Sequence, residues 1–150
     1  LLRERDDYEV VCLVRRGGGK SAAERAESII RDECEFDGFP QDADRILSKV
    51  SVVEGDVTSI VPEELAKDEA LKGVNIIFHC AADVNLGKDP TGKVFRINYD
   101  GTVNMINLAK LLNVKEVHSL IAVRLILLLL MLLQKMAYIQ LVILLHVKMV

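Results

Sequence analysis

Residues 74–85 read VNIIFHCAADVN, and this stretch decides the fold. It begins with an apolar run of strand length and continues into two small residues, Ala81 and Ala82, and then polar ones. A buried parallel strand delivers its carboxyl end to a ligand crevice in this way. We therefore take it as a central strand and interpret residues 8–119 as the units that flank it.

The composition of the chain limits its class. With 150 residues there is room for one domain with a substantial core. Residues 117–150 contain no Asp, Glu, Gly or Pro and carry +3, so the total of −3 leaves −6 on residues 1–116. An acidic body without a basic face argues against a nucleic-acid partner. The three cysteines are far apart and predict free thiols in a reducing compartment, and no metal site is predicted.

Two strand-and-helix units precede the central strand. Residues 10–14 form a continuous, largely β-branched apolar run, which the turn RRGGG at 15–19 ends. Ser21 and Glu24 make a capping box, which predicts the start of a helix. Residues 50–53 are the next predicted strand, and Pro62 starts a second helix that runs to Lys72.

A long helix and a short strand follow the central strand. Apolar residues recur every three or four positions from Val94 to Leu112, and Gly101 lies inside this face, where it allows a close approach to the sheet. Residues 114–117 are a fourth predicted strand. Strands that alternate with amphipathic helices imply a parallel sheet with right-handed crossovers. The fold class is therefore α/β, a partial Rossmann-type parallel sheet with flanking helices.

Local motifs near the strand ends have both functional and structural interpretations. GKS at 19–21 is typical of the end of a phosphate-binding loop, but that motif requires glycine where this chain has Val14. Arg15, Arg16 and the glycine turn form either a positive cup for a ribose phosphate or a solvated basic turn. His79 is predicted to be a packed core histidine rather than a base.

Four stretches together resemble the extended short-chain dehydrogenase/reductase group, and within it the fatty acyl-CoA reductases of the male sterility family. They are VCLVR at 11–15 with GKS at 19–21 and ER at 24–25, VVEGDV at 52–57, VNIIFHCAA at 74–82, and NYDGT at 98–102 leading into LAK at 108–110. The resemblance covers residues 8–119, which we take as a partial NAD(P)-binding domain, residues 1–119.

The resemblance implies an NADPH-dependent reduction of a fatty acyl-CoA thioester to a fatty alcohol. It also implies an intracellular location, on the cytoplasmic side of a peroxisomal or endoplasmic reticulum membrane. The cofactor-binding residues that it implies are Arg15, Arg16, Asp56, Val57, Ala81, Ala82 and Asn98. Among these, Arg15 faces the 2′-phosphate and Asp56 and Val57 hold the adenine, although Asp56 alone would be an ordinary turn residue. By similarity, Ser119 is the candidate catalytic serine of a Ser/Thr pair.

Two departures from the family pattern limit the activity expected of the chain. The first strand and its glycine-rich, pyrophosphate-binding turn are expected before Leu1 and are missing, which leaves two inner strand edges unpaired. The pair Tyr-x-x-x-Lys, in which the lysine prepares the tyrosine to donate a proton, is also missing, because residues 12, 103 and 142 are Cys, Val and Val. We therefore expect an inactive fragment. The alternatives are a thioester reductase domain acting on carrier-bound acyl chains, and a non-catalytic nucleotide-binding or membrane-associated interaction protein.

Residues 120–150 form a Leu-rich tail with a composition of its own. Residues 125–133 are nine consecutive apolar residues, and Gln134 and Lys135 follow them. A membrane span needs about 20 apolar residues, so a span here would carry these two polar residues or Arg124. The tail is interpreted as membrane-inserted, as a buried helix or strand that supplies the missing sheet contacts, or, as the first hypothesis, as out-of-frame sequence.

Overall fold

The computed structural model describes residues 2–4, 7–83, 89–119 and 142–147. In these residues the strands are β1 (Tyr8–Val14), β2 (Val50–Glu54), β3 (Ile76–His79), β4 (Glu116–Ser119) and β5 (Val142–Val147). The α-helices are α1 (Ala22–Phe36), α2 (Ala43–Leu47), α3 (Pro62–Leu65), α4 (Lys93–Phe95) and α5 (Gly101–Leu111). Short 3₁₀ turns cover Pro40–Asp42 and Glu69–Leu71, and a π-helical segment, Arg96–Asp100, joins α4 to α5.

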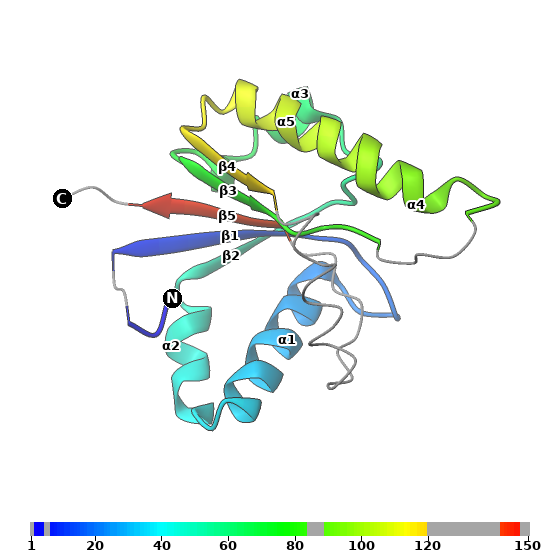
Figure 1. The fold of residues 1–150 in the computed structure, drawn as a ribbon. Coiled ribbons are helices and arrows are strands. Elements are labelled where there is room, and N and C mark those ends of the chain that lie inside the picture. Colours follow the sequence, from blue (N-terminus) through cyan, green and yellow to red (C-terminus); the bar gives the residue numbers. More distant parts are fainter. Residues whose placement is uncertain (1, 5–6, 84–88, 120–141, 148–150) are drawn as a thin grey trace.

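The strands form one sheet in the order β2-β1-β5-β3-β4. β1 is parallel to β2, and β3 is parallel to β4, whereas β5 is antiparallel to both of its neighbours, β1 and β3. The strands β1 to β4 therefore all point the same way. Figure 1 shows α1 and α2 on one face of the sheet and α3, α4 and α5 on the other. The predicted α/β fold of parallel strands with flanking helices is confirmed.

β5 occupies the centre of the sheet, where an unpaired gap was expected. Leu144 of β5 lies opposite Val11 of β1 and Ile77 of β3. The prediction of two unpaired inner edges is therefore wrong, because residues 142–147 hydrogen-bond to both edges. This agrees with the alternative in which the tail supplies the missing sheet contacts. The membrane-insertion and out-of-frame hypotheses also concern residues 120–141, which lie outside the described residues.

Apolar side chains pack on both faces of the sheet. The most deeply buried side chains on the α5 face come from several elements: Leu13, Leu71, Ile77, Met105, Leu108 and Leu144. A smaller cluster lies against α1: Val10, Cys12, Val14, Ala22 and Ala26. Burial raises the pKa of the Cys12 thiol to about 11, so Cys12 stays protonated at neutral pH and acts as a packing residue. Cys12, Cys34 and Cys80 are free thiols, as predicted.

The end of α5 shifts the fourth strand along the chain. Asn113 has a φ of 54°, its N–H donates to the Lys110 carbonyl, and the Val114 N–H donates to the Ala109 carbonyl. These two hydrogen bonds are those of a Schellman motif, which uses Val114 to close the helix and to pack against the core. β4 consequently spans Glu116–Ser119 rather than the predicted residues 114–117.

The helix predicted from Pro62 to Lys72 is broken in two. α3 ends at Leu65, and the Asp68 carboxylate accepts a hydrogen bond from the Ala70 N–H at 2.9 Å. This cap starts the 3₁₀ turn that follows α3. Leu71, at the end of the turn, is only 1% exposed, so the break places an apolar side chain in the core.

Leu144→Ala tests whether β5 belongs to the folded core. Leu144 is fully buried, so we expect the free energy of unfolding to fall by about 2–5 kcal/mol, measured by urea denaturation. The control is Leu111→Ala at a side chain that is half exposed, for which we expect a loss below about 1 kcal/mol. Equal small losses for the two variants would contradict the position of β5.

Candidate functional site

Parallel strands β1 to β4 end at the same side of the sheet, here called the carboxyl edge. Most of the residues implied by the resemblance lie at or directly after these ends: Arg15 and Arg16 after β1, Asp56 and Val57 after β2, Ala81 and Ala82 after β3, and Ser119 at the end of β4. The strand order reverses between β1 and β3, where β5 lies. In open α/β sheets, ligands bind outside the carboxyl ends of the strands at such a reversal.

Arg16 forms an ion pair with the neighbouring strand. Its Nε lies 3.1 and 3.2 Å from the two carboxylate oxygens of Glu54, at the end of β2, and its Nη2 donates to the same group. The Arg16 side chain is 72% exposed, so the pair adds little to stability. The pairing nevertheless neutralises both charges. A phosphate would have to displace Glu54 in order to bind Arg16.

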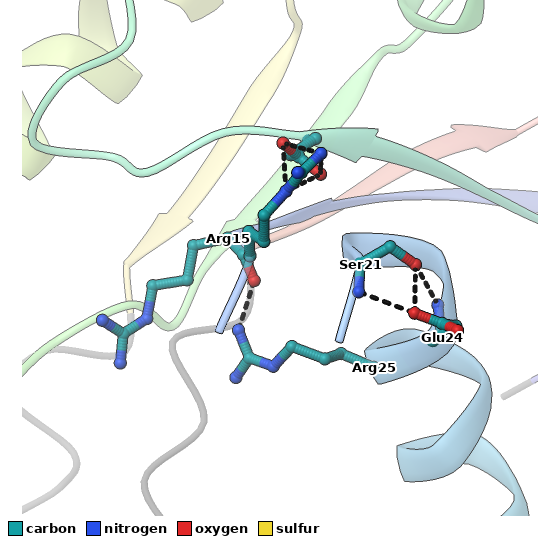
Figure 2. Close-up of polar contacts among 6 residues, drawn as sticks. Arg15, Ser21, Glu24 and Arg25 are labelled. Atoms are coloured by element: carbon teal, nitrogen blue, oxygen red, sulfur yellow. Dashed lines mark hydrogen bonds and ion pairs between the residues drawn. The ribbon is translucent and has the colours of Figure 1, made fainter. Parts of the chain in front are cut away.

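Arg15 differs from Arg16 because its guanidinium has no hydrogen-bond or ion-pair partner among the described residues. Its Nε is buried and unpartnered. Arg25, in the first turn of α1, donates from Nη1 to the Arg15 carbonyl (Figure 2). Figure 2 also shows the Arg15 guanidinium pointing away from the start of α1, on the same side as the Arg25 head group. Two arginines without a carboxylate partner among the described residues therefore follow β1, and Arg25 is tied to the backbone of Arg15.

Arg25 is a candidate site residue that the sequence reasoning did not single out. It appears there only inside the stretch ER at 24–25 that carries the resemblance. The available signal was its position directly after Glu24 of the capping box. A residue in the first turn of a helix lies close to the strand end that precedes it.

The glycine turn after β1 is a tight reversal and not a phosphate-binding loop. Gly17 and Lys20 exchange both backbone hydrogen bonds, at 3.3 and 3.1 Å. Gly18 and Gly19 between them have φ values of 62° and 74°, which a two-residue turn of this kind requires. The amides of Gly17 and Lys20 are therefore already hydrogen-bonded within the turn and cannot bind a phosphate. The rejection of the phosphate-binding-loop interpretation agrees with this geometry.

The turn after β2 is held by its own side chains. Asp56 Oδ1 accepts from the Thr58 N–H at 2.9 Å and from the Thr58 hydroxyl at 2.7 Å. Val57 is 4% exposed, and its carbonyl accepts from Asn104 Nδ2 at 2.8 Å. A Cβ on Gly101 would lie only 2.9 Å from Val57 Cγ2, so the close approach predicted for Gly101 is to Val57 and not to the sheet itself. The turn is therefore rigid, and the adenine-binding role of Asp56 and Val57 stays a prediction.

Asn98 fixes the segment that follows β3. Its Oδ1 accepts from the Asp83 N–H at 2.8 Å, and its Nδ2 donates to the Asp83 carbonyl at 3.0 Å. Asn98 lies in the π-helical segment, a geometry that is frequent at functional sites. Ala81 and Ala82 directly precede this clamp and are 0% and 3% exposed. Asn98 thus sets the path of the backbone beside the two alanines.

His79 is a packed core residue, as predicted. It is 1% exposed, and its Nε2 lies 3.1 Å from Thr102 Oγ1. The Thr102 hydroxyl donates to the Asn98 carbonyl at 2.6 Å, so it accepts from a protonated Nε2. His79 Nδ1 is then an acceptor, and no donor among the described residues reaches it. Burial lowers the pKa of His79, which keeps the ring neutral at pH 7.

Ser119 reaches the carboxyl edge as the last residue of β4. It pairs in register with His79 of β3 and is exposed. This position beside the end of β3 leaves its hydroxyl accessible. Its catalytic role, which was implied by the resemblance, stays a prediction.

A family model described as "Male sterility protein", a model of NAD-binding domains, matches residues 1–123. The chain belongs to this family. No curated protein and no solved structure matches the chain at a significant level. As a male sterility family domain, the chain is an NAD(P)-binding domain, and the resemblance is confirmed at that level.

The carboxyl edge of this male sterility domain has two arginines that suit a phosphate group of a dinucleotide cofactor. The Nε of Arg15, which has no partner among the described residues, suits a phosphate group together with Arg25.

Within residues 2–4, 7–83, 89–119 and 142–147, no group of three possible metal ligands lies close enough together to hold a metal ion. No helix in the same residues has the length and apolar character for crossing a membrane.

The pH dependence of stability tests the assignment of His79. A folded-state pKa below the unfolded value means that the folded chain binds fewer protons than the unfolded chain, so stability is full above about pH 6.5 and is lost as the pH falls toward the folded pKa. We expect His79→Gln, which can still donate to Thr102 but does not titrate, to lose less unfolding free energy than the parent between about pH 7 and pH 5. A parental slope in His79→Gln would refute the assignment.

Proposed function

We propose that this chain binds NADPH as the cofactor domain of a fatty acyl-CoA reductase, an enzyme that reduces an acyl thioester to a fatty alcohol. The observation that carries the proposal is the Arg15 guanidinium at the end of β1, which has no partner among the described residues and whose backbone carbonyl holds Arg25. In dinucleotide-binding folds, an acidic residue at this place binds the ribose 2′-hydroxyl of NAD, whereas an arginine accommodates the 2′-phosphate of NADP.

The charges around β1 support NADP over NAD. The carboxylate of Glu54, at the end of the neighbouring strand, is held by Arg16 at 3.1 Å. Part of its acceptor capacity is therefore already used, which disfavours binding of a ribose hydroxyl, and Arg16 screens its repulsion of a phosphate. Arg15 and Arg25 present planar guanidinium groups, which match phosphate geometry with two parallel hydrogen bonds.

The remaining residues of the proposed site shape and orient the cofactor. We assign the adenine to the turn of Asp56 and Val57, which its own hydrogen bonds hold in place. Ala81 and Ala82 are buried, so in this proposal they support the edge from within and do not present a surface to the cofactor. Asn98 holds the backbone after these alanines through two hydrogen bonds. The family resemblance supplies the thioester substrate and the intracellular, cytoplasmic-side location of this proposal.

The chemistry proposed for this chain is binding and orientation. NADPH, when bound, supplies a hydride to the carbonyl carbon. None of the three tyrosines in the 150 residues has a lysine four positions later, so no proton transfer is assigned to a tyrosine here. His79 is buried and neutral, and Ser119 is the hydroxyl at the carboxyl edge that can face a substrate carbonyl.

Arginine substitutions test the assignment of the 2′-phosphate site. We expect Arg15→Ala to weaken NADPH binding about 10- to 100-fold, because a charge-assisted hydrogen bond to phosphate is lost. Arg25→Ala should have an effect in the same direction. The dissociation constants are measured by isothermal titration calorimetry with NADPH and with NADH.

The matched control is the double variant Arg16→Ala/Glu54→Ala, which removes the neighbouring arginine together with the carboxylate that it neutralises. Because the two charges cancel, we expect the affinity for NADPH to change less than about threefold, whereas Arg16→Ala alone would leave Glu54 to repel the phosphate. NADH should bind the parent at least about tenfold more weakly than NADPH and should be insensitive to Arg15→Ala. A larger loss in the double variant than in Arg15→Ala would contradict the assignment, and no NADPH binding by the parent would refute the proposed function.

A further inference from the structure

β5 enters the sheet from the side at which its neighbours leave it. Its first residue, Val142, is in register with Leu13 near the end of β1 and with His79 at the end of β3. Its last residue, Val147, is in register with Tyr8 at the start of β1. The chain that follows β5 therefore leaves from the opposite edge of the sheet.

The antiparallel direction of β5 removes the helix N-terminus that usually binds the pyrophosphate of a dinucleotide. In dinucleotide-binding folds, the pyrophosphate lies on the N-terminus of the helix that follows the strand at the reversal point. Because β5 is antiparallel, a helix after β5 cannot begin at the carboxyl edge. β5 itself fills the position between β1 and β3, so another strand cannot pair there in the same fold.

α1 begins at the carboxyl edge, but its N-terminus is already capped. The Ser21 hydroxyl accepts from the Glu24 N–H at 3.2 Å, and the Glu24 carboxylate accepts from the Ser21 N–H at 2.8 Å (Figure 2). The hydrogen bonds from the backbone N–H and the hydroxyl of Ser21 lower the pKa of Glu24, so this group is a carboxylate at neutral pH. The capping group carries a negative charge, which opposes a bound pyrophosphate.

α4 also begins after a strand of this edge, β3, and a carboxylate outside the helix accepts from an amide of its first turn. The Asp89 carboxylate accepts from the Phe95 N–H at 3.0 Å. Hydrogen bonds from the backbone amides, first that of Phe95, lower the pKa of Asp89. At the start of α1 the Glu24 N–H is thus bound to the Ser21 hydroxyl and the Ser21 N–H to the Glu24 carboxylate, and at the start of α4 the Phe95 N–H is bound to the Asp89 carboxylate. Arg15 and Arg25 follow β1, and neither has a carboxylate partner among the described residues, which suits one phosphate.

We propose that the folded chain recognises the 2′-phosphoadenosine part of NADPH, and that the described residues offer no binding site for the pyrophosphate and nicotinamide parts. This inference rests on the proposed function, because it uses the same 2′-phosphate site. Its consequence is that a 2′-phosphorylated adenine mononucleotide binds as tightly as the whole cofactor.

Calorimetric titration of the 150-residue chain with NADPH and with adenosine 2′-monophosphate tests the inference. We expect the two dissociation constants to agree within about threefold. NADPH binding tighter by about tenfold or more would overturn the inference and leave the proposed function standing. Absence of binding by both compounds would overturn the proposed function, and the inference with it.

Arg15→Ala provides an internal check on the same titrations. Because both compounds share the 2′-phosphate, the substitution should weaken both by the same factor. A loss confined to NADPH would show that Arg15 acts on another part of the dinucleotide, and would overturn the inference.

Discussion

The antiparallel pairing of β5 with β1 and β3 is the interaction on which the rest of the structure depends. Without it, the half made of β1 and β2 and the half made of β3 and β4 would share no backbone hydrogen bonds. Leu144 extends this pairing into the core, because it is fully buried between Val11 and Ile77. The strand thus joins the two halves both by hydrogen bonds and by apolar packing.

The same pairing determines which binding elements of an NAD(P)-binding domain are present at the carboxyl edge. β1 to β4 remain parallel, so their carboxyl ends gather the residues expected of an NAD(P)-binding domain. The central strand, however, runs in the reverse direction and delivers no helix N-terminus to that edge. At the same edge, Arg25 holds the carbonyl of Arg15 after β1, and the carboxylates of Glu24 and Asp89 accept from amides at the starts of α1 and α4.

Much of the fold could be predicted from local patterns. The apolar runs gave the strands, and the Ser21–Glu24 capping box gave the start of α1, because both depend on residues close in sequence. The place of β5 could not be predicted in this way. A long Leu-rich run has neither a helical nor an alternating period, and its pairing partners are more than 60 residues away along the chain. The shift of β4 has a similar cause, since Val114 is apolar enough for a strand but is used by a helix-ending motif.

In the candidate site, too, the sequence predicted some features, whereas others depend on tertiary contacts. The resemblance named the residues at the carboxyl edge, and the geometry ranks them: Arg16 is paired with Glu54, whereas Arg15 is unpaired and lies with Arg25. Charge pairing across neighbouring strands depends on tertiary contacts, so the local residue pattern did not separate the two arginines, and only the resemblance assigned the 2′-phosphate to Arg15.

Amide hydrogen exchange along residues 142–147 tests the central position of β5 most directly. If β5 lies between β1 and β3, its hydrogen-bonded amides should exchange as slowly as those of β1, because both open only with the whole sheet. Exchange of the β5 amides at the rate of an unfolded chain, while β1 and β2 stay protected, would contradict this account.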